Sequence, residues 1–183
     1  MTIVVKEPVK NATALKVQVV PSTEKDIPKI MEIINAEAKR SGAVLPVFED
    51  EVKAWVNQGM SFIAKTDLGE IVGHHSASPA WPQSGWIELR AAVVLPEYRG
   101  NGINAQLKGA IIDAIIEQNP NATIVSVKNK SSNGRQVLGE LGFTKIPQSA
   151  APKELFEIGP VGETYDIYVY TPSKDKVKEL VRA

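Results

Sequence analysis

The sequence contains no cysteine. This absence excludes disulfides, a thiolate zinc site, a cysteine nucleophile and any acyl-cysteine intermediate. The sequence also lacks an excess of charge of one sign, because 21 Lys and Arg residues balance 21 Asp and Glu residues. A general binder of nucleic acid carries a basic excess. The composition therefore predicts a protein without a nucleic-acid partner.

Long hydrophobic runs are absent as well. A membrane-spanning helix needs roughly 18 apolar residues in a row, and no stretch of this sequence approaches that length. The short apolar run at residues 3–5 is followed by Lys6 and Glu7, which is unlike a secretion signal. We therefore expect a cytoplasmic protein with no membrane partner. Apolar residues make up 43% of the 183 residues, which is enough for the core of one domain.

The period of the hydrophobic pattern changes repeatedly along the chain. Alternating or continuous apolar segments predict strands, and a period near 3.6 predicts helices. We expect strands at residues 15–20, 61–66, 71–78, 86–94, 122–127, 143–146 and 165–171, and helices around residues 27–38, 52–56, 103–118 and 131–141. This order predicts a single α/β domain whose mixed, mostly antiparallel sheet has one parallel step and is flanked by helices. We assign residues 15–171 to this domain, residues 1–14 to an N-terminal arm, and residues 172–183 to a short C-terminal helix or tail.

The most informative segment is the glycine-rich turn between the strand predicted at residues 86–94 and the helix that begins at Ile103. Residues 99–102 read Arg-Gly-Asn-Gly. Glycine lets backbone N–H groups approach an anion closely, and the start of a helix adds unpaired N–H groups and partial positive charge. The pattern favours a diphosphate-binding turn, to which Arg99 would add a fixed cation. The alternative is a tight turn that needs glycine only for its dihedral angles.

Residues 100–105, which read Gly-Asn-Gly-Ile-Asn-Ala, also fit the G-x-G-x-x-G/A pattern of dinucleotide-binding proteins. Three features speak against that interpretation. Residues 96–99 separate the pattern from its strand, four predicted strands precede it, and the next strand ends in Val-Lys-Asn at residues 127–129 instead of an acidic residue. The sequence has no GxxxxGK[ST] motif, which excludes a P-loop nucleotide triphosphatase.

Three stretches carry a family resemblance. Residues 94–96 read Val-Leu-Pro, residues 98–104 read Tyr-Arg-Gly-Asn-Gly-Ile-Asn, and residues 138–143 read Leu-Gly-Glu-Leu-Gly-Phe. They resemble the acyl-CoA-binding core of the GNAT N-acetyltransferase superfamily, in which V-x-P is followed by Y-[RQ]-G-x-G-[IV]-[GA] and later by a helix-end signature. The resemblance covers roughly residues 15–171. It departs from the family at Asn104, where Gly or Ala is usual.

The resemblance implies a cofactor and its site. The sheet would be splayed between its fourth and fifth strands, near Val94, and would hold acetyl-CoA as a cosubstrate without a metal ion. Residues 92–94 would contact the pantetheine arm, the turn would hold the diphosphate, and Asn129 and Ser132 would approach the pantetheine. The cofactor-binding residues are then Ala92, Val93, Val94, Arg99, Gly100, Asn101, Gly102, Ile103, Asn104, Ala105, Asn129 and Ser132.

Acetyl transfer to an amine requires a base, because a primary ammonium group with a pKa of about 10.4 is neutral in only about one molecule in 2,500 at pH 7. Glu88 is the candidate base. It lies six residues before Val94, so the two side chains have the same parity if no bulge intervenes. It also stands where some branches of the resembled family carry a catalytic glutamate. The alternative is an ordinary strand carboxylate, exposed or paired with Arg90. A backbone N–H near Val94 is the candidate oxyanion donor.

The proton donor is less obvious. Many members of the resembled family have a Tyr four residues before the Gly of the Gly-Phe signature, where this sequence has Leu138. The tyrosines of the last predicted strand are the substitutes, and among Tyr165, Tyr168 and Tyr170 we take Tyr168 as the candidate acid. For each of them the alternative is packing on an amphipathic strand.

The two histidines, His74 and His75, are adjacent in a predicted strand and therefore point to opposite faces, where they cannot easily chelate one metal ion. One of them could act as a base on the acceptor side. The alternative is a strand residue whose ring nitrogens are satisfied by hydrogen bonds.

These features predict an enzyme that transfers an acetyl group from acetyl-CoA to a primary amine, by direct attack assisted by a general base. Its partners would be a CoA thioester and the amine acceptor, and a homodimer is left open. A small-molecule acceptor is favoured over a protein N-terminus, because branches of the family that modify N-termini tend to have a Tyr where Leu138 stands and an acidic residue near Ser126. The alternative is a non-catalytic module that binds or senses acyl-CoA.

Overall fold

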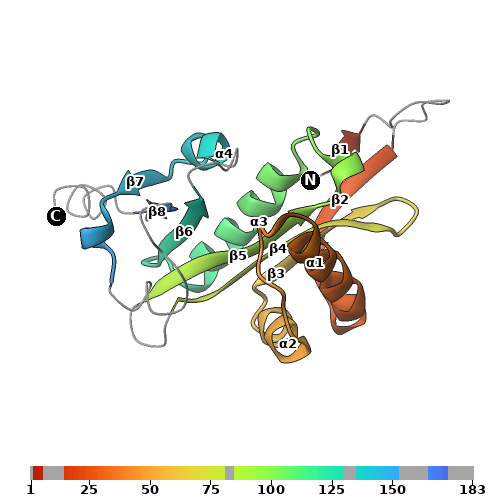
Figure 1. The fold of residues 1–183 in the computed structure, drawn as a ribbon, viewed down its shortest axis with the longest axis horizontal. Helices are drawn as coiled ribbons and strands as arrows, with labels where there is room; N and C mark the ends of the chain where they lie inside the picture. Colours follow the sequence, from red (N-terminus) through yellow and green to blue (C-terminus); the bar gives the residue numbers. More distant parts are fainter. Residues whose placement is uncertain (1, 6–14, 81–84, 130–134, 153–164, 173–183) are drawn as a thin grey trace. The chain divides into compact units, whose positions relative to one another are not determined.

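The computed structural model describes residues 2–5, 15–80, 85–129, 135–152 and 165–172 (Figure 1). The strands are β1 (Thr2–Val5), β2 (Leu15–Pro21), β3 (Ser61–Thr66), β4 (Ile71–Pro79), β5 (Trp86–Val94), β6 (Thr123–Asn129), β7 (Thr144–Ile146) and β8 (Tyr165–Tyr170). The helices are α1 (Ile27–Ser41), α2 (Glu49–Asn57), α3 (Ile103–Gln118) and α4 (Arg135–Glu140), with short 3-10 helices η1 (Glu24–Asp26), η2 (Pro96–Tyr98) and η3 (Gln148–Ala150). The predicted order of elements is confirmed, and β1 is added to it.

The chain divides into two compact units, so that β4, β5 and α3 each contribute to both. The first unit contains residues 1–77 and 90–114, and the second contains residues 78–89 and 115–183. In the first unit, β1, β2, β3 and β4 pair in that order and the three pairings are antiparallel. In the second unit, the first residues of β5 pair with β6 in parallel, and β8 pairs antiparallel with β6 and with β7.

This pairing confirms the predicted fold class, an α/β fold with a mixed and mostly antiparallel sheet. The parallel step is short. It joins Trp86–Glu88 of β5 to Thr123–Val125 of β6, which are the first three residues of each strand.

Helices cover both faces of the sheet in the first unit. Ile63 of β3 and Val93 of β5 pack with α1 and α2. The next residue along each strand, Ala64 or Val94, packs with α3 instead. Because successive strand residues point to opposite faces, α1 and α2 cover one face and α3 covers the other. The most buried helix residues of this unit are Ile27, Ile30, Ile33, Ile34, Val52, Trp55, Ile103, Leu107, Ile111 and Ile112.

The second unit has its own apolar cluster, which the strand register explains. Val125 of β6 pairs with Val169 of β8, and both side chains are fully buried. Two residues further along, Ile167 pairs with Ile146 of β7 on the same face. Trp86 of β5 joins this cluster. The apolar residues that predicted these strands are therefore the ones that hold them together.

Two expected segments lie partly or wholly outside the described residues. The arm assigned to residues 1–14 contributes β1, whose residues Thr2–Val5 pair with Leu15–Gln18 of β2. Residues 6–14 lie outside the described part of the chain, as do residues 173–183 of the expected C-terminal helix or tail.

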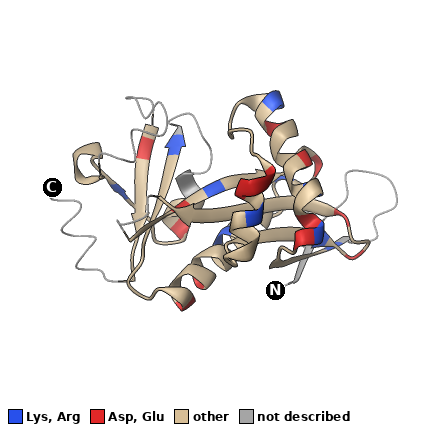
Figure 2. Cartoon of the chain, turned by 90° about the horizontal axis from the view of Figure 1, so that it is seen from below, with Lys and Arg blue, Asp and Glu red and all other residues tan. Residues whose placement is uncertain are grey.

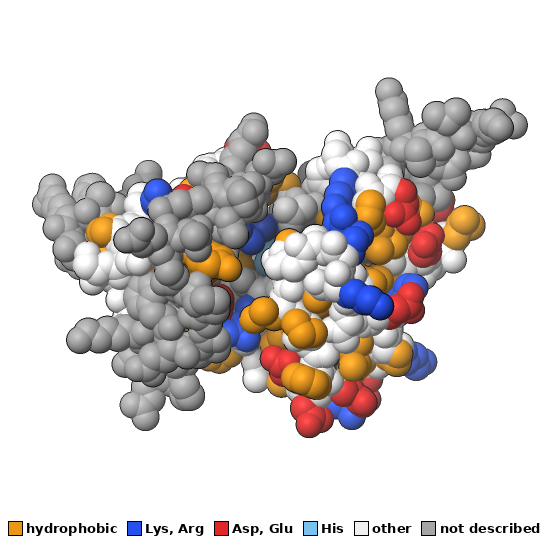
Figure 3. All heavy atoms as spheres, viewed as in Figure 1, with side chains coloured by type: hydrophobic (Ala, Val, Ile, Leu, Met, Phe, Trp, Pro, Cys, Tyr) orange, Lys and Arg blue, Asp and Glu red, His pale blue; other side chains and the backbone are white. Residues whose placement is uncertain are grey.

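Acidic and basic residues both occur on the described helices and strands. Acidic and basic residues are interspersed along the helices and strands (Figure 2), and the face seen in Figure 3 shows both signs together. Several of these residues form ion pairs within one helix, such as Lys29–Glu32 and Lys53–Glu49. Among the described residues, no helix has both the length and the apolar character that crossing a membrane requires.

Gly73 gives a test of the packing of α3 on β4. A Cβ atom at this position would lie 3.1 Å from Leu107 Cδ1 and 3.2 Å from the carbonyl oxygen of Val93. We expect Gly73→Ala to lower the free energy of unfolding by about 1–3 kcal/mol, because a methyl group overpacks this contact. The measurement is urea unfolding.

Gly109→Ala is the matched control, because a Cβ at Gly109 of α3 would meet nothing within 4 Å. Alanine inside a helix is favoured over glycine, so this variant should gain roughly 0.5–1 kcal/mol. Equal stabilities of the two variants would contradict the close approach of α3 to β4.

Candidate active site

The glycine-rich turn of the first unit is built as an open cradle. β5 ends at Val94, η2 follows, and α3 begins at Ile103. Gly100 has a φ of 80° and Gly102 a φ of 75°, values in the left-handed region that favours glycine. A Cβ atom at either position would meet nothing within 4 Å, so the surface over the turn is open. The first N–H groups of α3 have no acceptor within the helix. The turn therefore has the geometry of an anion-binding site.

Side chains hold this turn in place before any ligand arrives. The Asn101 side chain donates from Nδ2 to the carbonyl oxygens of Tyr98, at 3.1 Å, and Arg99, at 3.2 Å. The Tyr98 hydroxyl donates to Glu70 Oε2 at 3.0 Å. A turn fixed in this way loses little conformational entropy when it binds an anion. Asn101 was expected to contribute its backbone, and its side chain has this additional role.

Arg99 is tied to protein groups. Its Nε donates to the carbonyl oxygen of Val94 at 2.8 Å, and its Nη2 donates to Glu37 Oε2 of α1 at 3.0 Å. Burial acts to raise the pKa of the Glu37 carboxyl, but hydrogen bonds from Arg40 and Ser41 and the charge of Arg99 lower it overall. Arg99 was expected to add a cation at the diphosphate. The structure shows that it also links the end of β5 to α1.

The course of β5 changes at Ala91. This residue has a φ of 49°, and among the described residues it is the one non-glycine residue with a positive φ. The strict alternation of side chains does not continue through such a residue. The parity argument that placed Glu88 and Val94 on one face therefore does not hold. Beyond Ala91, Ala92 is half-buried, whereas Val93 and Val94 are buried.

Both histidines lie inside the first unit. His74 is fully buried, its Nδ1 is 3.0 Å from the carbonyl oxygen of Ala91, and its Nε2 is 3.0 Å from Ser61 Oγ. Burial lowers the pKa of His74 to about 4, against a weaker opposing effect of the hydrogen bond to Ala91. His75 is also buried, and its Nε2 is 3.3 Å from Lys108 Nζ. Both residues are therefore buried strand residues whose ring nitrogens have polar partners, and neither is an exposed base.

The predicted acid and base belong to the second unit, where the register separates them. Glu88 pairs with Val125, and Tyr168 pairs with the next residue of β6, Ser126. Because paired residues share a face and neighbours alternate, Glu88 and Tyr168 lie on opposite faces of this sheet. Tyr165 pairs with Asn129 and therefore shares the face of Glu88. This separation depends on pairing between distant strands, so no local signal could have shown it.

Glu88 is half-buried and influences a neighbouring charge. Burial lowers the pKa of Lys128, and the carboxylate of Glu88 acts in the opposite direction. Leu138 is a fully buried residue of α4. Asn129 is the last residue of β6, and Ser132 lies outside the described residues. The structure thus shows Glu88 near Lys128, and the prediction for Ser132 stays a prediction.

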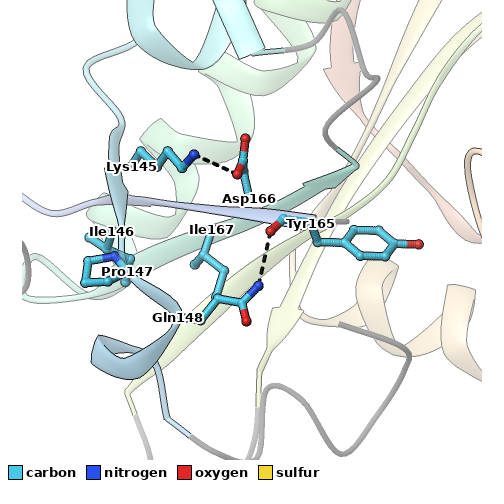
Figure 4. Close-up of a pocket in the computed structure, with 7 residues that line it drawn as sticks. All are labelled: Lys145, Ile146, Pro147, Gln148, Tyr165, Asp166 and Ile167. Carbon is cyan, nitrogen blue, oxygen red and sulfur yellow. Dashed lines mark hydrogen bonds and ion pairs between the residues drawn. The ribbon is translucent and has the colours of Figure 1, made fainter. Parts of the chain in front are cut away.

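A hollow that the sequence did not indicate opens beside β7 and β8 (Figure 4). Its volume is about 330 Å³, and Lys145, Ile146, Pro147, Gln148, Tyr165, Asp166 and Ile167 line it. Lys145 Nζ lies 2.7 Å from Asp166 Oδ1, and Gln148 Nε2 donates to the carbonyl oxygen of Tyr165 at 3.2 Å. None of the predicted cofactor-binding residues that the structure describes lines this hollow. Its carboxylate already has a partner, so no reaction is assigned to it.

A mixed, mostly antiparallel sheet with an open turn between a strand and a long helix is the architecture that the family resemblance implied. The profile of the acetyltransferase (GNAT) family matches residues 27–143 of this chain. The chain therefore belongs to the GNAT acetyltransferase family, as its motifs predicted, and the predicted enzyme class is confirmed with it. No curated protein sequence matches this chain.

Solved structures of this family share the fold. N-acetylglutamate synthase from Neisseria gonorrhoeae, complexed with coenzyme A and N-acetyl-glutamate, has a TM-score of 0.69 and 18% identity, over 90% of this chain and 36% of that chain. This chain thus spans about a third of that enzyme. A Mycobacterium tuberculosis protein in complex with CoA has a TM-score of 0.68 and 16% identity, over 85% of this chain and 99% of that chain. A phosphinothricin acetyltransferase from Sinorhizobium meliloti, in complex with AcCoA, has a TM-score of 0.61 and 16% identity, over 84% of this chain and 85% of that chain.

The buried His74 predicts how stability depends on pH. In the unfolded chain the imidazole binds a proton below about pH 6.5, and in the folded protein only below about pH 4. The neutral imidazole of His74 therefore makes its full contribution to the free energy of unfolding above pH 6.5. As the pH falls toward 4, this contribution decreases by about 1.4 kcal/mol per pH unit. Urea unfolding at pH 7 and pH 5 measures this loss. His74→Gln has no titrating group and should lose less stability over the same interval, whereas equal losses would contradict the assignment.

Proposed function

We propose that this chain transfers an acetyl group from acetyl-CoA to the primary amine of a small molecule, with Glu88 as the general base. The observation that carries the proposal is the open turn at Gly100–Gly102, which is fixed by Asn101 and followed directly by the N-terminus of α3. Such a turn is complementary to a diphosphate. Membership of the acetyltransferase family supports acetyl-CoA as the diphosphate ligand, and all three structural neighbours above were solved with coenzyme A or acetyl-CoA.

Each predicted cofactor residue has a place in this proposal. Backbone N–H groups of residues 100–105 bind the diphosphate, and the backbone of residues 92–94 binds the pantetheine arm. Arg99 acts indirectly, because its guanidinium fixes the Val94 carbonyl where β5 enters the turn. Asn129 and Ser132 remain assigned to the pantetheine by the family resemblance. Bound acetyl-CoA supplies an acyl carbonyl that is activated as a thioester.

The protein must then move protons and stabilise charge. Glu88 accepts a proton from the acceptor ammonium, directly or through water, because only the neutral amine attacks a carbonyl. The N–H of Val94 is the proposed donor to the oxyanion that develops during attack. The C–S bond of the thioester then breaks, and an acid protonates the departing CoA thiolate. Tyr168 was the predicted acid, but its position on the face opposite to Glu88 favours Tyr165 for that role.

The proposal of a small-molecule acceptor is based on the residues at two positions, Leu138 and Ser126. Leu138 fills a core position of α4 with an apolar side chain, and Ser126 is a fully buried residue of β6. Neither carries the phenol or the carboxylate that branches acting on protein N-termini tend to have there. The names of two structural neighbours, an N-acetylglutamate synthase and a phosphinothricin acetyltransferase, refer to small acceptors of those proteins. At their low identities they support the fold and not a particular acceptor.

Substitution in the turn tests cofactor binding. We expect coenzyme A to raise the melting temperature of the wild type, because a ligand that binds only the folded state stabilises it. Gly102→Asp should abolish this shift, since it places a carboxylate where the diphosphate binds. Gly69→Asp is the matched control, because Gly69 also has a positive φ, of 85°, and open space around it, but lies in the β3–β4 turn. An equal shift in both variants would refute the proposed diphosphate site.

A screen of acceptors decides between an enzyme and a binding module. Amines, polyamines, amino acids and peptides are offered with acetyl-CoA, and release of the CoA thiol is measured. Turnover with a small amine supports the proposal, and turnover with peptides alone moves the acceptor to protein N-termini. Tight binding of coenzyme A without turnover of any acceptor would favour the non-catalytic module, for which the buried Leu138 is the structural argument.

Glu88→Gln tests the base once an acceptor is known. The amide keeps the shape of the side chain but cannot accept the proton, so kcat should fall by roughly 10²- to 10⁴-fold at neutral pH. The affinity for acetyl-CoA should persist, and the deficit should shrink at high pH, where more of the amine is neutral. Glu97→Gln, on the exposed surface of η2, is the control. A loss of melting temperature without a specific loss of kcat would identify Glu88 as a structural partner of Lys128.

A further inference from the structure

We propose that His74 is a positioning residue for the acetyl transfer: it holds the carbonyl group of Ala91 and thereby fixes the backbone of β5 from Ala92 to Val94. This inference rests on the proposed function, which uses that backbone to bind the pantetheine arm and the oxyanion. The residue lies on β4, next to β5, and has no direct contact with the proposed ligand in this role.

Ala91 is the first part of the argument. Its φ of 49° is unfavourable for a residue with a side chain, because Cβ approaches the neighbouring carbonyl oxygen. A strained conformation persists only where surrounding groups over-determine it, and such residues concentrate at functional sites. Ala91 stands directly before the three residues that are proposed to contact the cofactor. A group that fixes Ala91 therefore fixes the entry to that segment.

His74 is the group that fixes it. A carbonyl oxygen can only accept, so the 3.0 Å contact requires a proton on His74 Nδ1, which donates to Ala91. The other nitrogen, Nε2, must then accept from the Ser61 hydroxyl at 3.0 Å. Ser61 Oγ is in turn 2.9 Å from Ser22 Oγ. One tautomer satisfies the whole chain of hydrogen bonds.

The ring has no freedom to leave this position. His74 is 0% exposed, Ser61 is 1% exposed, and Trp55 of α2 stacks on the imidazole with ring centroids 6.1 Å apart. A neutral imidazole is required for this network, and burial keeps His74 neutral at physiological pH by lowering its pKa to about 4. The complete burial also excludes the ring from touching substrate, which limits it to an indirect role.

A second clamp holds the other end of the same segment. Arg99 Nε donates to the carbonyl oxygen of Val94 at 2.8 Å, and Glu37 holds the guanidinium at 3.0 Å. The carbonyl groups of Ala91 and Val94 are therefore each fixed by a side chain from another element, and the segment between them is pinned at both ends. Misplacement of such a backbone by about 1 Å can cost roughly 100-fold in rate.

Two isosteric substitutions separate the two ring nitrogens. His74→Asn keeps an N–H near the place of Nδ1 and loses the contact with Ser61. His74→Gln keeps a polar group near the place of Nε2 and loses the donor to Ala91. We expect kcat of His74→Gln to be roughly 10- to 100-fold below the wild type, and that of His74→Asn to stay within about 3-fold. Both variants bury an altered polar group and should lose similar melting temperature. Equal losses of kcat in the two variants would overturn the proposal.

Backbone amide NMR gives a readout that needs no activity. In the wild type, the ¹⁵N shifts of His74 should show the proton on Nδ1, and the amide signals of Ala92, Val93 and Val94 should move in His74→Gln but little in His74→Asn. If the wild type neither binds coenzyme A nor turns over any acceptor, the proposed function fails while this comparison still decides whether His74 fixes β5. Unchanged signals in both variants would overturn the positioning role.

A double-substitution cycle tests whether His74 acts through Ala91. Glycine accepts a positive φ without strain, so Ala91→Gly should raise the melting temperature. With Gly at position 91 the backbone conformation no longer depends on the hydrogen bond from His74. The fold decrease in kcat caused by His74→Gln should therefore be smaller in Ala91→Gly than in the wild type. Additive losses would show that His74 acts elsewhere and would refute the proposal. Ser61→Ala is the control for the contact at His74 Nε2. It should lower the melting temperature but change kcat little.

Discussion

The carbonyl group of Ala91, held by a buried imidazole, is the constraint on which the proposed site depends. β5 begins as a regular strand paired with β6 and then passes through a residue with a φ of 49°. In our proposal, the hydrogen bond from His74 to the Ala91 carbonyl offsets the cost of that conformation. Only after it do Val93 and Val94 take their places in the clusters of α1–α2 and of α3. The open turn that follows starts from a strand end whose position is already fixed.

In the first unit, buried polar side chains form hydrogen-bonded networks around the two histidines of β4. The Ser22–Ser61–His74 series ends on a backbone carbonyl, and Lys108 is buried against His75 on the other face of β4. An unpaired group of this kind costs more than the hydrogen bond contributes. Each network is therefore sensitive to the loss of any member. A satisfied buried network makes the residues that it joins more rigid, as the proposed role of β5 requires.

The fold alone leaves the acceptor open, because function resides in side chains placed on a shared scaffold. The structural neighbours are named for different acceptors and share 16% to 18% identity with this chain. What is particular to this chain lies in a few positions. Leu138 is apolar and buried, Glu88 is half-buried near Lys128, and Arg99 is bound to Glu37. These positions define the chemistry to test, and the glycine-rich turn is the proposed binding site of the cosubstrate.

The sequence by itself determined the features that local patterns encode. Hydrophobic period predicted the order of strands and helices, and the glycine-rich turn with its flanking motifs predicted the acetyltransferase family, because both depend on neighbouring residues. Only the tertiary structure decided which side chains meet and which share a face of the sheet. Glu37 meets Arg99 across 62 positions of sequence, and the faces of Glu88 and Tyr168 follow from a register set by distant strands. Ala91 shows the same limit, since alanine does not signal a positive φ and the hydrogen bond that sustains it comes from another strand. Contacts between residues far apart in sequence leave no periodic trace, and so only the folded chain reveals them.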